Sequence, residues 1–346
     1  PRTMSDRAST HPDAAPAPEA ALPSHASPLL AWRTLPFPAP WDAVFEQTGP
    51  LVVEVGFGDG RFTVRRAKAE PGSRFVGLEV SSGSLQRALR RVKREGVGNV
   101  RLAKTGAHVA LRQLFAPASV DALVVNFPCP WPKERHAKHR LLQRSFFELA
   151  GSRLREGGEL RLATDHPDYL GFALAEGAAS GLYDTLRPPA PPDVFETKYA
   201  LKWREQGKPL HYVVFRRNAV PAPAIDPWER PTIMPHALLR GTLPAKAPFD
   251  KRVDRYAEGH VILHELAAVL GGEDGAGRWL VRATVEEPDL RQQLLVLAQQ
   301  RTPDEVIVRL ESFGDPLITP TTRGCVHAVT EWLLAATDLS VTARNY

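Results

Sequence analysis

The sequence predicts an α/β fold, a doubly wound and mostly parallel sheet, followed by a smaller C-terminal α+β domain. Three observations predict it. From Leu51 onward, short apolar runs alternate with helix-like stretches, and such runs indicate strands buried on both faces by helices. A glycine-rich turn follows the first run, as expected where a strand passes into a helix. A proline-rich segment then separates this part from further strand-like runs.

Five strand–helix pairs follow one another along the first part. Each pair begins with a β-branched apolar run and continues into residues with the apolar spacing of a helix. The strands are expected at 51–55, 74–80, 99–104, 120–127 and 158–165, and the helices near Arg61 and at 83–96, 108–115, 140–154 and 168–180. The run HYVVFRR at 211–217 is expected to close the sheet, with antiparallel pairing as one option. This alternation is typical of a doubly wound sheet.

Composition divides the chain into four segments. Residues 1–34 are rich in Ala, Pro and Ser, which predicts a disordered N-terminal tail. Residues 35–217 form the first domain, and the prolines of 218–250 predict a linker. Residues 251–346 are expected to form the small α+β domain, with strand-like runs and one helix that carries Cys325 in its core-facing side. The strand-like runs are 259–266, 278–287 and 305–313, and the helix is 322–336.

The charge is distributed unevenly over a chain of 346 residues with a formal net charge of +5. The segment 252–346 holds 9 Lys and Arg against 14 Asp and Glu, a net charge of −5, so the first 251 residues carry +10. If the protein binds a polyanion, the first domain is therefore expected to hold it. No apolar run reaches the roughly 18 residues of a membrane span. Two cysteines are too few for a disulfide framework, which predicts a cytoplasmic protein.

The stretch EVGFGDG at 54–60 predicts a nucleotide-type cofactor site at a strand-to-helix turn. Glycines let the backbone approach a ligand, and the helix N-terminus favours negative groups. Arg61 replaces the third small residue of the dinucleotide fingerprint, and Glu79 ends the next strand, where a carboxylate can accept ribose hydroxyls. These features favour S-adenosylmethionine over a nicotinamide cofactor. A different nucleotide, a tightly packed turn and a solvated Glu79 remain as alternatives.

The stretch NFPCPWPKERHAKHR at 126–140 follows the fourth strand, which is expected to lie beside the first at the ligand-binding crevice. Three prolines stiffen this loop. Trp131 is expected to be either a stacking surface or a plug over the core. The basic run that follows is expected to clamp phosphates, with a solvated charged face as the alternative. His136 and His139 have no evident third partner, so no metal site is predicted.

These motifs, together with VGLEV at 76–80, ATD at 163–165 and TKYALKW at 197–203, resemble the bacterial tRNA (guanine-N7)-methyltransferase family over 51–217. The resemblance implies a class I S-adenosylmethionine-dependent methyltransferase, Rossmann-like and RNA-binding, that methylates guanine N7 in the tRNA variable loop. It implies cofactor contacts at Glu54, Gly56, Gly58, Glu79, Gly106 and Asn126. It implies substrate contacts at Lys133, Arg135, His136, Lys138, Arg140, Asp165, Thr197, Lys198, Tyr199 and Ala200. Cys129, at the family's Asp position, and Asp165 would be the catalytic residues.

The chain departs from the family at three acidic positions, which are Gly106, Cys129 and Ala200 here. Methyl transfer to N7 uses an available lone pair and needs no proton removal, so a general base is not obligatory. We therefore expect an active methyltransferase that works by in-line displacement. A catalytically impaired tRNA-binding pseudo-methyltransferase is the alternative. Asp165 could also serve as a helix N-cap, and Cys129 as a methyl-accepting nucleophile or simply a small side chain.

Overall fold

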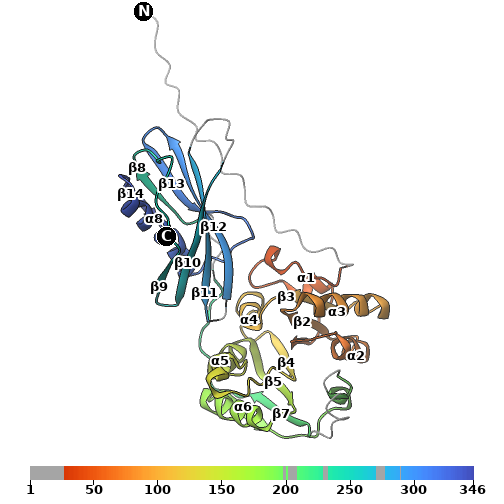
Figure 1. Cartoon of the computed structure of the whole chain (residues 1–346). Helices are drawn as coiled ribbons and strands as arrows, with labels where there is room; N and C mark the ends of the chain where they lie inside the picture. Colours follow the sequence, from red (N-terminus) through yellow and green to blue (C-terminus); the bar gives the residue numbers. More distant parts are fainter. Residues whose placement is uncertain (1–26, 198–199, 202–208, 229–232, 270–276, 289) are drawn as a thin grey trace, which may run out of the picture.

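The protein contains two seven-stranded sheets, one following the other along the chain (Figure 1). The computed structural model describes residues 27–197, 200–201, 209–228, 233–269, 277–288 and 290–346. The first sheet has the strand order β3-β2-β1-β4-β5-β7-β6. Its strands are β1 (Leu51–Val55), β2 (Arg74–Glu79), β3 (Val100–Lys104), β4 (Val120–Asn126), β5 (Leu154–Thr164), β6 (Tyr183–Leu186) and β7 (His211–Arg217).

Strand pairing confirms the predicted doubly wound sheet. β1 pairs in parallel with β2 on one side and with β4 on the other, so the strand order reverses between β1 and β4. β7 pairs antiparallel with β5, which confirms the strand and its antiparallel option, but β6, which the sequence did not predict, pairs with β7 and forms the edge of the sheet. The crevice beyond the carboxyl ends of β1 and β4 is where an open sheet of this kind binds ligands.

Helices cover both faces of the first sheet, because each carries an apolar stripe that only the sheet can bury. On one face, α2 (Arg61–Ala69) and α3 (Ser82–Glu95) share an apolar cluster with β1–β4. On the other face, α4 (Ala107–Leu114), α5 (Arg144–Arg153) and α6 (Pro167–Ser180) share a second cluster. In the described ranges, no helix combines the length and the apolar composition that a bilayer crossing requires.

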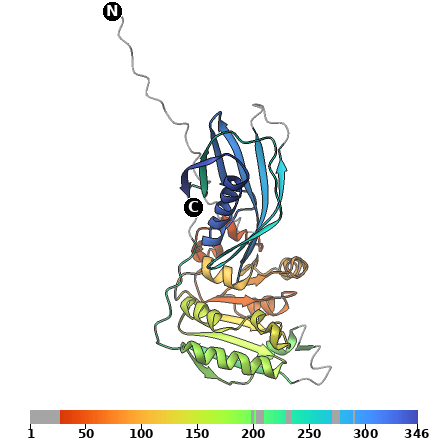
Figure 2. The same ribbon diagram turned by 60° about the vertical axis from the view of Figure 1, so that its left-hand side comes forward.

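The second sheet is antiparallel throughout, with the order β14-β8-β13-β12-β11-β10-β9. The helix α8 (Pro320–Ala336) packs on one face, where Figure 2 shows it lying across the strands. Cys325 on this helix is fully buried, as predicted. The strands are β8 (His236–Arg240), β9 (Arg252–Tyr256), β10 (Gly259–Ala268), β11 (Arg278–Glu287), β12 (Leu290–Thr302), β13 (Glu305–Leu310) and β14 (Ser340–Asn345).

Two segment boundaries differ from the sequence prediction. β8 lies within 218–250, the predicted linker, because His236–Arg240 adds a strand between β13 and β14. The end of the predicted tail is also packed. The Leu30 backbone N–H donates to the carbonyl oxygen of Leu102 on β3, the Pro28 carbonyl oxygen accepts from the Leu102 N–H, and Trp32 in the short helix η1 (Trp32–Thr34) is buried. The apolar residues at 29–32 explain this, since their burial outweighs the polar average of the segment. Residues 1–26 lie outside the described residues.

A buried arginine ties the segment after β7 to the first domain. Arg153 is 1% exposed and donates hydrogen bonds to the carbonyl oxygens of Leu111 at 2.8 Å and Ile225 at 2.5 Å. Nearby, Gln113 accepts from the Trp228 backbone N–H at 2.7 Å and donates to its carbonyl oxygen at 3.1 Å. These bonds hold 225–228 against α4, on the path of the chain towards the second sheet.

We expect Arg153→Met to lower the free energy of unfolding by about 2–4 kcal/mol, because it leaves buried carbonyl oxygens without donors. Denaturant unfolding, followed by the shift of the midpoint, measures the effect. Arg155→Met is the matched control, since Arg155 is exposed and pairs with Asp121 on the surface. Its replacement should change stability by no more than about 0.5 kcal/mol. Equal effects of the two substitutions would contradict the role given to Arg153.

Candidate active site at the switch point of the first sheet

The glycine turn after β1 requires glycine for conformational reasons. Gly56, Gly58 and Gly60 have φ values of +73°, +59° and +74°, in the left-handed region that side chains disfavour. At Gly60 there is also no room, because an added Cβ would lie 2.7 Å from Cβ of Ala88 on α3. The turn therefore brings bare backbone to the crevice and leads directly into α2.

The Glu79 carboxylate at the end of β2 fixes this turn. Its Oε2 accepts from the Gly58 backbone N–H at 3.1 Å, and its Oε1 accepts from the N–H groups of Val80 and Ser81 at 2.9 Å each. A carboxylate has about four acceptor positions, so one is left for a ligand. Glu79 is thus neither a freely solvated strand end nor solely a ligand contact.

Glu54 places a carboxylate inside the protein. It is 4% exposed, and its Oε2 accepts from the hydroxyl of Thr63 on α2. Burial disfavours the charged form and raises the pKa of Glu54 to about 7, although the hydroxyl of Thr63 and the nearby side-chain amide of Asn126 oppose this. A carboxyl of this kind is close to half ionised at neutral pH, and a cationic ligand would complete its ionisation.

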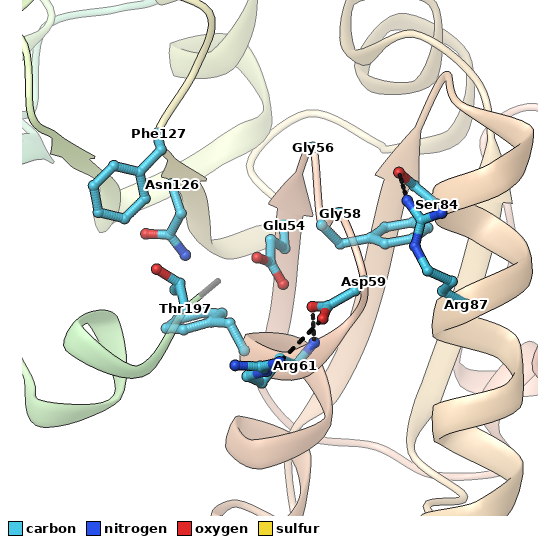
Figure 3. A pocket seen from close by; sticks show the side chains of 12 residues that line it. Glu54, Gly56, Gly58, Asp59, Arg61, Ser84, Arg87, Asn126, Phe127 and Thr197 are labelled. Atoms are coloured by element: carbon cyan, nitrogen blue, oxygen red, sulfur yellow. Dashed lines mark hydrogen bonds and ion pairs between the residues drawn. The ribbon is translucent and has the colours of Figure 1, made fainter. Parts of the chain in front are cut away.

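Asn126 at the end of β4 presents a donor beside Glu54, and it lowers the pKa of that carboxyl without making a hydrogen bond of ordinary geometry. Its Nδ2 is buried and has no hydrogen-bond partner among the described residues. Figure 3 shows the amide directed into the space between Glu54 and Thr197. Buried donors are rarely left unpaired, so this nitrogen marks a place for a ligand acceptor. A carboxylate and an amide donor side by side complement a zwitterion, which carries an ammonium and a carboxylate.

Two adjoining hollows meet at Gly56. The larger, of about 800 Å³, is bounded by Glu79 and Gly106 from the sheet edge and by Lys138 and His139 from the loop after β4. The smaller, of about 70 Å³, contains Glu54, Gly58, Asn126 and Thr197. Ligand pockets usually measure about 300–1,000 Å³, so only the larger hollow can hold most of a cofactor. The predicted cofactor residues are therefore divided between the two hollows.

The loop from Phe127 to Trp131 is strained at both ends. Phe127 and Trp131 have φ values of +53° and +43°, which are uncommon outside glycine. Trp131 is 36% exposed and lies at the rim of the larger hollow, with its ring centroid 5.1 Å from that of His139. It is thus not a plug over the core. Cys129 is exposed and lines neither hollow.

The basic run forms the short 3₁₀ helix η2 (Glu134–His139) and divides into two groups. Lys133 and Arg135 are exposed and lie outside both hollows, whereas Lys138 borders the larger one. Arg140 has an internal role that the sequence did not reveal. It donates to the carbonyl oxygens of Pro130 at 3.1 Å and Trp131 at 3.3 Å, and its guanidinium lies over the Phe172 ring. Arg140 therefore holds the loop in place, in addition to any contact with a substrate.

No metal site accompanies these residues in the described part of the chain, where no three His, Cys, Asp or Glu side chains are grouped to hold an ion. The rings of His136 and His139 lie 6.2 Å apart, centroid to centroid. His136 instead contacts the edge of the Trp131 ring. The two histidines thus support the aromatic corner of the loop.

The other predicted substrate residues are only partly brought together. Asp165 follows β5 at the same sheet edge, but the N-cap of α6 is His166, so the N-cap interpretation of Asp165 is wrong. Thr197 lines the smaller hollow, and its hydroxyl accepts from the Ala200 backbone N–H at 3.1 Å. Ala200 is buried. Lys198 and Tyr199 lie outside the described residues.

Several residues of the site escaped the sequence analysis. His166 Nδ1 and His211 Nε2 are buried without a partner among the described residues, at the edge where Thr164 pairs with His211. Single histidines carry no spacing signal, so no pattern could have found them. Arg61 and Arg87 line the smaller hollow, and Pro288 of the second sheet lines the larger one.

Comparison with known proteins gives three findings. The sequence model of the family described as "Putative methyltransferase" matches residues 48–213. A tRNA (guanine-N(7)-)-methyltransferase of Thermus thermophilus is 42% identical over 295 residues, which span 84% of this chain and 91% of the relative. The enzyme of the same name from Deinococcus radiodurans is 43% identical over 292 residues, 82% of this chain and 89% of the relative. Alignments of this length extend beyond the first sheet into the second.

The buried carboxyl of Glu54 predicts a pH-dependent stability. Its pKa is about 7 in the folded protein and 4.5 ordinarily, so the folded protein holds an extra proton between these pH values. Stability should therefore fall as the pH rises through this window. Glu54→Gln cannot ionise and should gain up to about 3 kcal/mol relative to the natural protein between pH 5 and pH 8. Denaturant midpoints across this range measure the difference.

Thr63→Val is the matched variant for this measurement. It removes the hydroxyl that stabilises the ionised carboxylate while keeping the shape of the side chain, so the fall in stability with pH should become larger. Parallel pH profiles for the natural protein and Glu54→Gln would show that Glu54 ionises as it does in water.

Proposed function

The chain belongs to the family of bacterial tRNA (guanine-N(7)-)-methyltransferases, and on this premise we propose that it transfers the methyl group of S-adenosylmethionine to N7 of a guanosine in the tRNA variable loop. The observation that carries the proposal is the larger hollow. One wall of it comes from the glycine turn and the ends of β2 and β3, and the opposite wall comes from the basic loop after β4. The residues expected to hold the cofactor and the basic loop after β4 thus border the same space.

The cofactor fits the two hollows in one orientation. Its ribose would lie at Glu79, which keeps one acceptor position for a hydroxyl, and its adenine would lie in the larger hollow towards Gly106. Its amino acid end would pass Gly56 into the smaller hollow. There the ammonium would meet the Glu54 carboxylate, and the carboxylate would accept from the unused Nδ2 of Asn126. The site therefore offers a partner to each charged end of the zwitterion.

Methyl transfer to guanine N7 depends more on the alignment of the two reactants than on proton transfer. Guanine N7 has a free lone pair, and the sulfonium loses its charge as the methyl group moves. No general base is required, so the replacement of the family's Asp by Cys129 does not by itself prevent the reaction. Asp165 would accept from the guanine N1–H and exocyclic amine, leaving N7 directed at the cofactor. Exposed Lys133 and Arg135 would bind phosphates of the tRNA backbone.

Methyl transfer tests the proposal directly. Purified protein should move labelled methyl groups from S-adenosylmethionine to a tRNA with a variable-loop guanosine, and not to the same tRNA with adenosine there. Adenine also has an N7, but it lacks the N1–H and the 2-amino group that Asp165 would bind. A related family enzyme serves as the positive control. Tight tRNA binding without transfer, restored by Cys129→Asp, would instead identify an impaired tRNA-binding protein.

The exposed cations Lys133 and Arg135 of the loop after β4 predict a change in the salt dependence of tRNA binding. Lys133→Ala and Arg135→Ala should each weaken tRNA binding and reduce the slope of log K against log[salt] by about 1, because each removes one phosphate contact. Filter binding or fluorescence anisotropy between low and moderate salt measures the slope. Lys246→Ala is the control, since Lys246 is an exposed cation between β8 and β9 of the second sheet and lies outside both hollows. An unchanged slope in the first two variants would remove these residues from the tRNA interface.

A further inference from the structure

The second sheet contributes a wall to the larger hollow. Pro288 lies in the turn that joins β11 to β12, and it borders the same space as Glu79 and Gly106. The other residues that line this hollow belong to the first sheet and its connections. Figure 1 shows the β11–β12 end of the second sheet approaching α4, which begins directly after Gly106. Residues far apart in the chain therefore meet at the cofactor side of the site.

Apolar contacts hold this turn against the first domain. Leu290, at the start of β12, is 9% exposed and belongs to the same apolar cluster as Ala107 of α4. Leu317 belongs to that cluster as well. The side chain of Gln292 on β12 accepts from the Leu317 backbone N–H at 2.8 Å and donates to the Leu317 carbonyl oxygen at 2.9 Å. A further bond of 2.5 Å runs from Arg33 to the Asp315 carbonyl oxygen. Leu290 and Leu317, which follow Pro288 in the chain, are therefore packed against the first domain.

The position of Glu79 indicates which part of a nucleoside the turn would meet. The larger hollow extends from Glu79 to the turn after β3, so a ribose held at Glu79 would have space for its base on the side of that turn. Gly106 in that turn has no side chain, and an added Cβ would find nothing within 4 Å. The base would thus lie over open backbone, with Pro288 as the opposing surface. A proline ring is rigid, apolar and lacks an N–H group that would have to be desolvated.

We propose that Pro288, which directly follows β11, binds the adenine ring of the cofactor, so that the second sheet is a structural part of the cofactor site. This inference rests on the proposed use of S-adenosylmethionine. It assigns the acidic second domain a role that requires no contact with RNA. It also explains why the domain can carry a net negative charge beside a tRNA-binding surface, since its contribution is apolar and directed at the cofactor.

Calorimetric binding of two ligands to the full chain tests the proposal. Pro288→Ala removes two ring methylenes from the contact and should weaken both S-adenosylmethionine and 5′-methylthioadenosine by the same factor, about five- to tenfold. The second ligand shares the adenosine half and lacks the amino acid end. Asn126→Ala should weaken S-adenosylmethionine alone. Equal loss for both ligands in Pro288→Ala places the contact at the adenosine half.

Pro303→Ala is the matched control, because Pro303 occupies the β12–β13 turn of the same sheet and lies outside both hollows. It should leave both dissociation constants within about twofold, the range of a substitution without contact to the ligand. Unchanged binding in Pro288→Ala, or equal losses in the two proline variants, would overturn the inference. Failure of the natural protein to bind S-adenosylmethionine would overturn the proposed function instead.

Hydrogen exchange gives a second measurement that needs no substitution. Saturating S-adenosylmethionine should slow amide exchange at Glu287 and Leu290, which flank Pro288, as well as at the glycine turn. Exchange at Glu305, beside Pro303, should stay the same. A ligand effect restricted to the first sheet would mean that the β11–β12 turn does not contact the cofactor, and it would contradict the proposal.

Discussion

The contacts of one carboxylate organise the site. Glu79 accepts from three backbone N–H groups and thereby ties the glycine turn after β1 to the end of β2. The turn has three left-handed glycines, so its backbone has many alternatives in the absence of this tie. The position of Gly56, where the two hollows meet, follows from it. A side chain that the sequence assigns to ligand binding is thus first a structural element of the pocket.

Most of the first sheet could be predicted because β1, β2 and β4 consist mainly of apolar residues, as expected for strands that helices bury on both faces. The second sheet could be predicted only in part. β12 carries several glutamines, and β14 is exposed along its whole length, so neither shows the alternation that marks a strand. β8 lies in the proline-rich segment 218–250, whose composition predicts a linker. These strands are defined by their neighbours in the sheet, which the local sequence does not contain.

The residues of the site likewise fall into those whose placement the local sequence predicts and those whose placement depends on distant parts of the chain. Glu54, Gly56, Glu79 and Asn126 could be predicted because strand ends in a parallel sheet meet at one edge whatever the rest of the chain does. The structural role of Arg140 could not be predicted, since its bonds to Pro130 and Trp131 depend on the path of the loop. Pro288 could not be found from the sequence, because it reaches the hollow through the docking of a separate sheet.

The packing of Pro28–Leu30 on β3 also has a consequence for association between molecules. β3 is the outer strand of its sheet, and Leu102 there exchanges backbone hydrogen bonds with Pro28 and Leu30. An uncovered outer strand is a template for pairing with another chain. The short N-terminal stretch therefore caps the sheet, and a chain trimmed at residue 35 would expose a ladder on which copies could join edge to edge. The tendency of copies to associate through this sheet edge thus depends on residues that take no part in the chemistry.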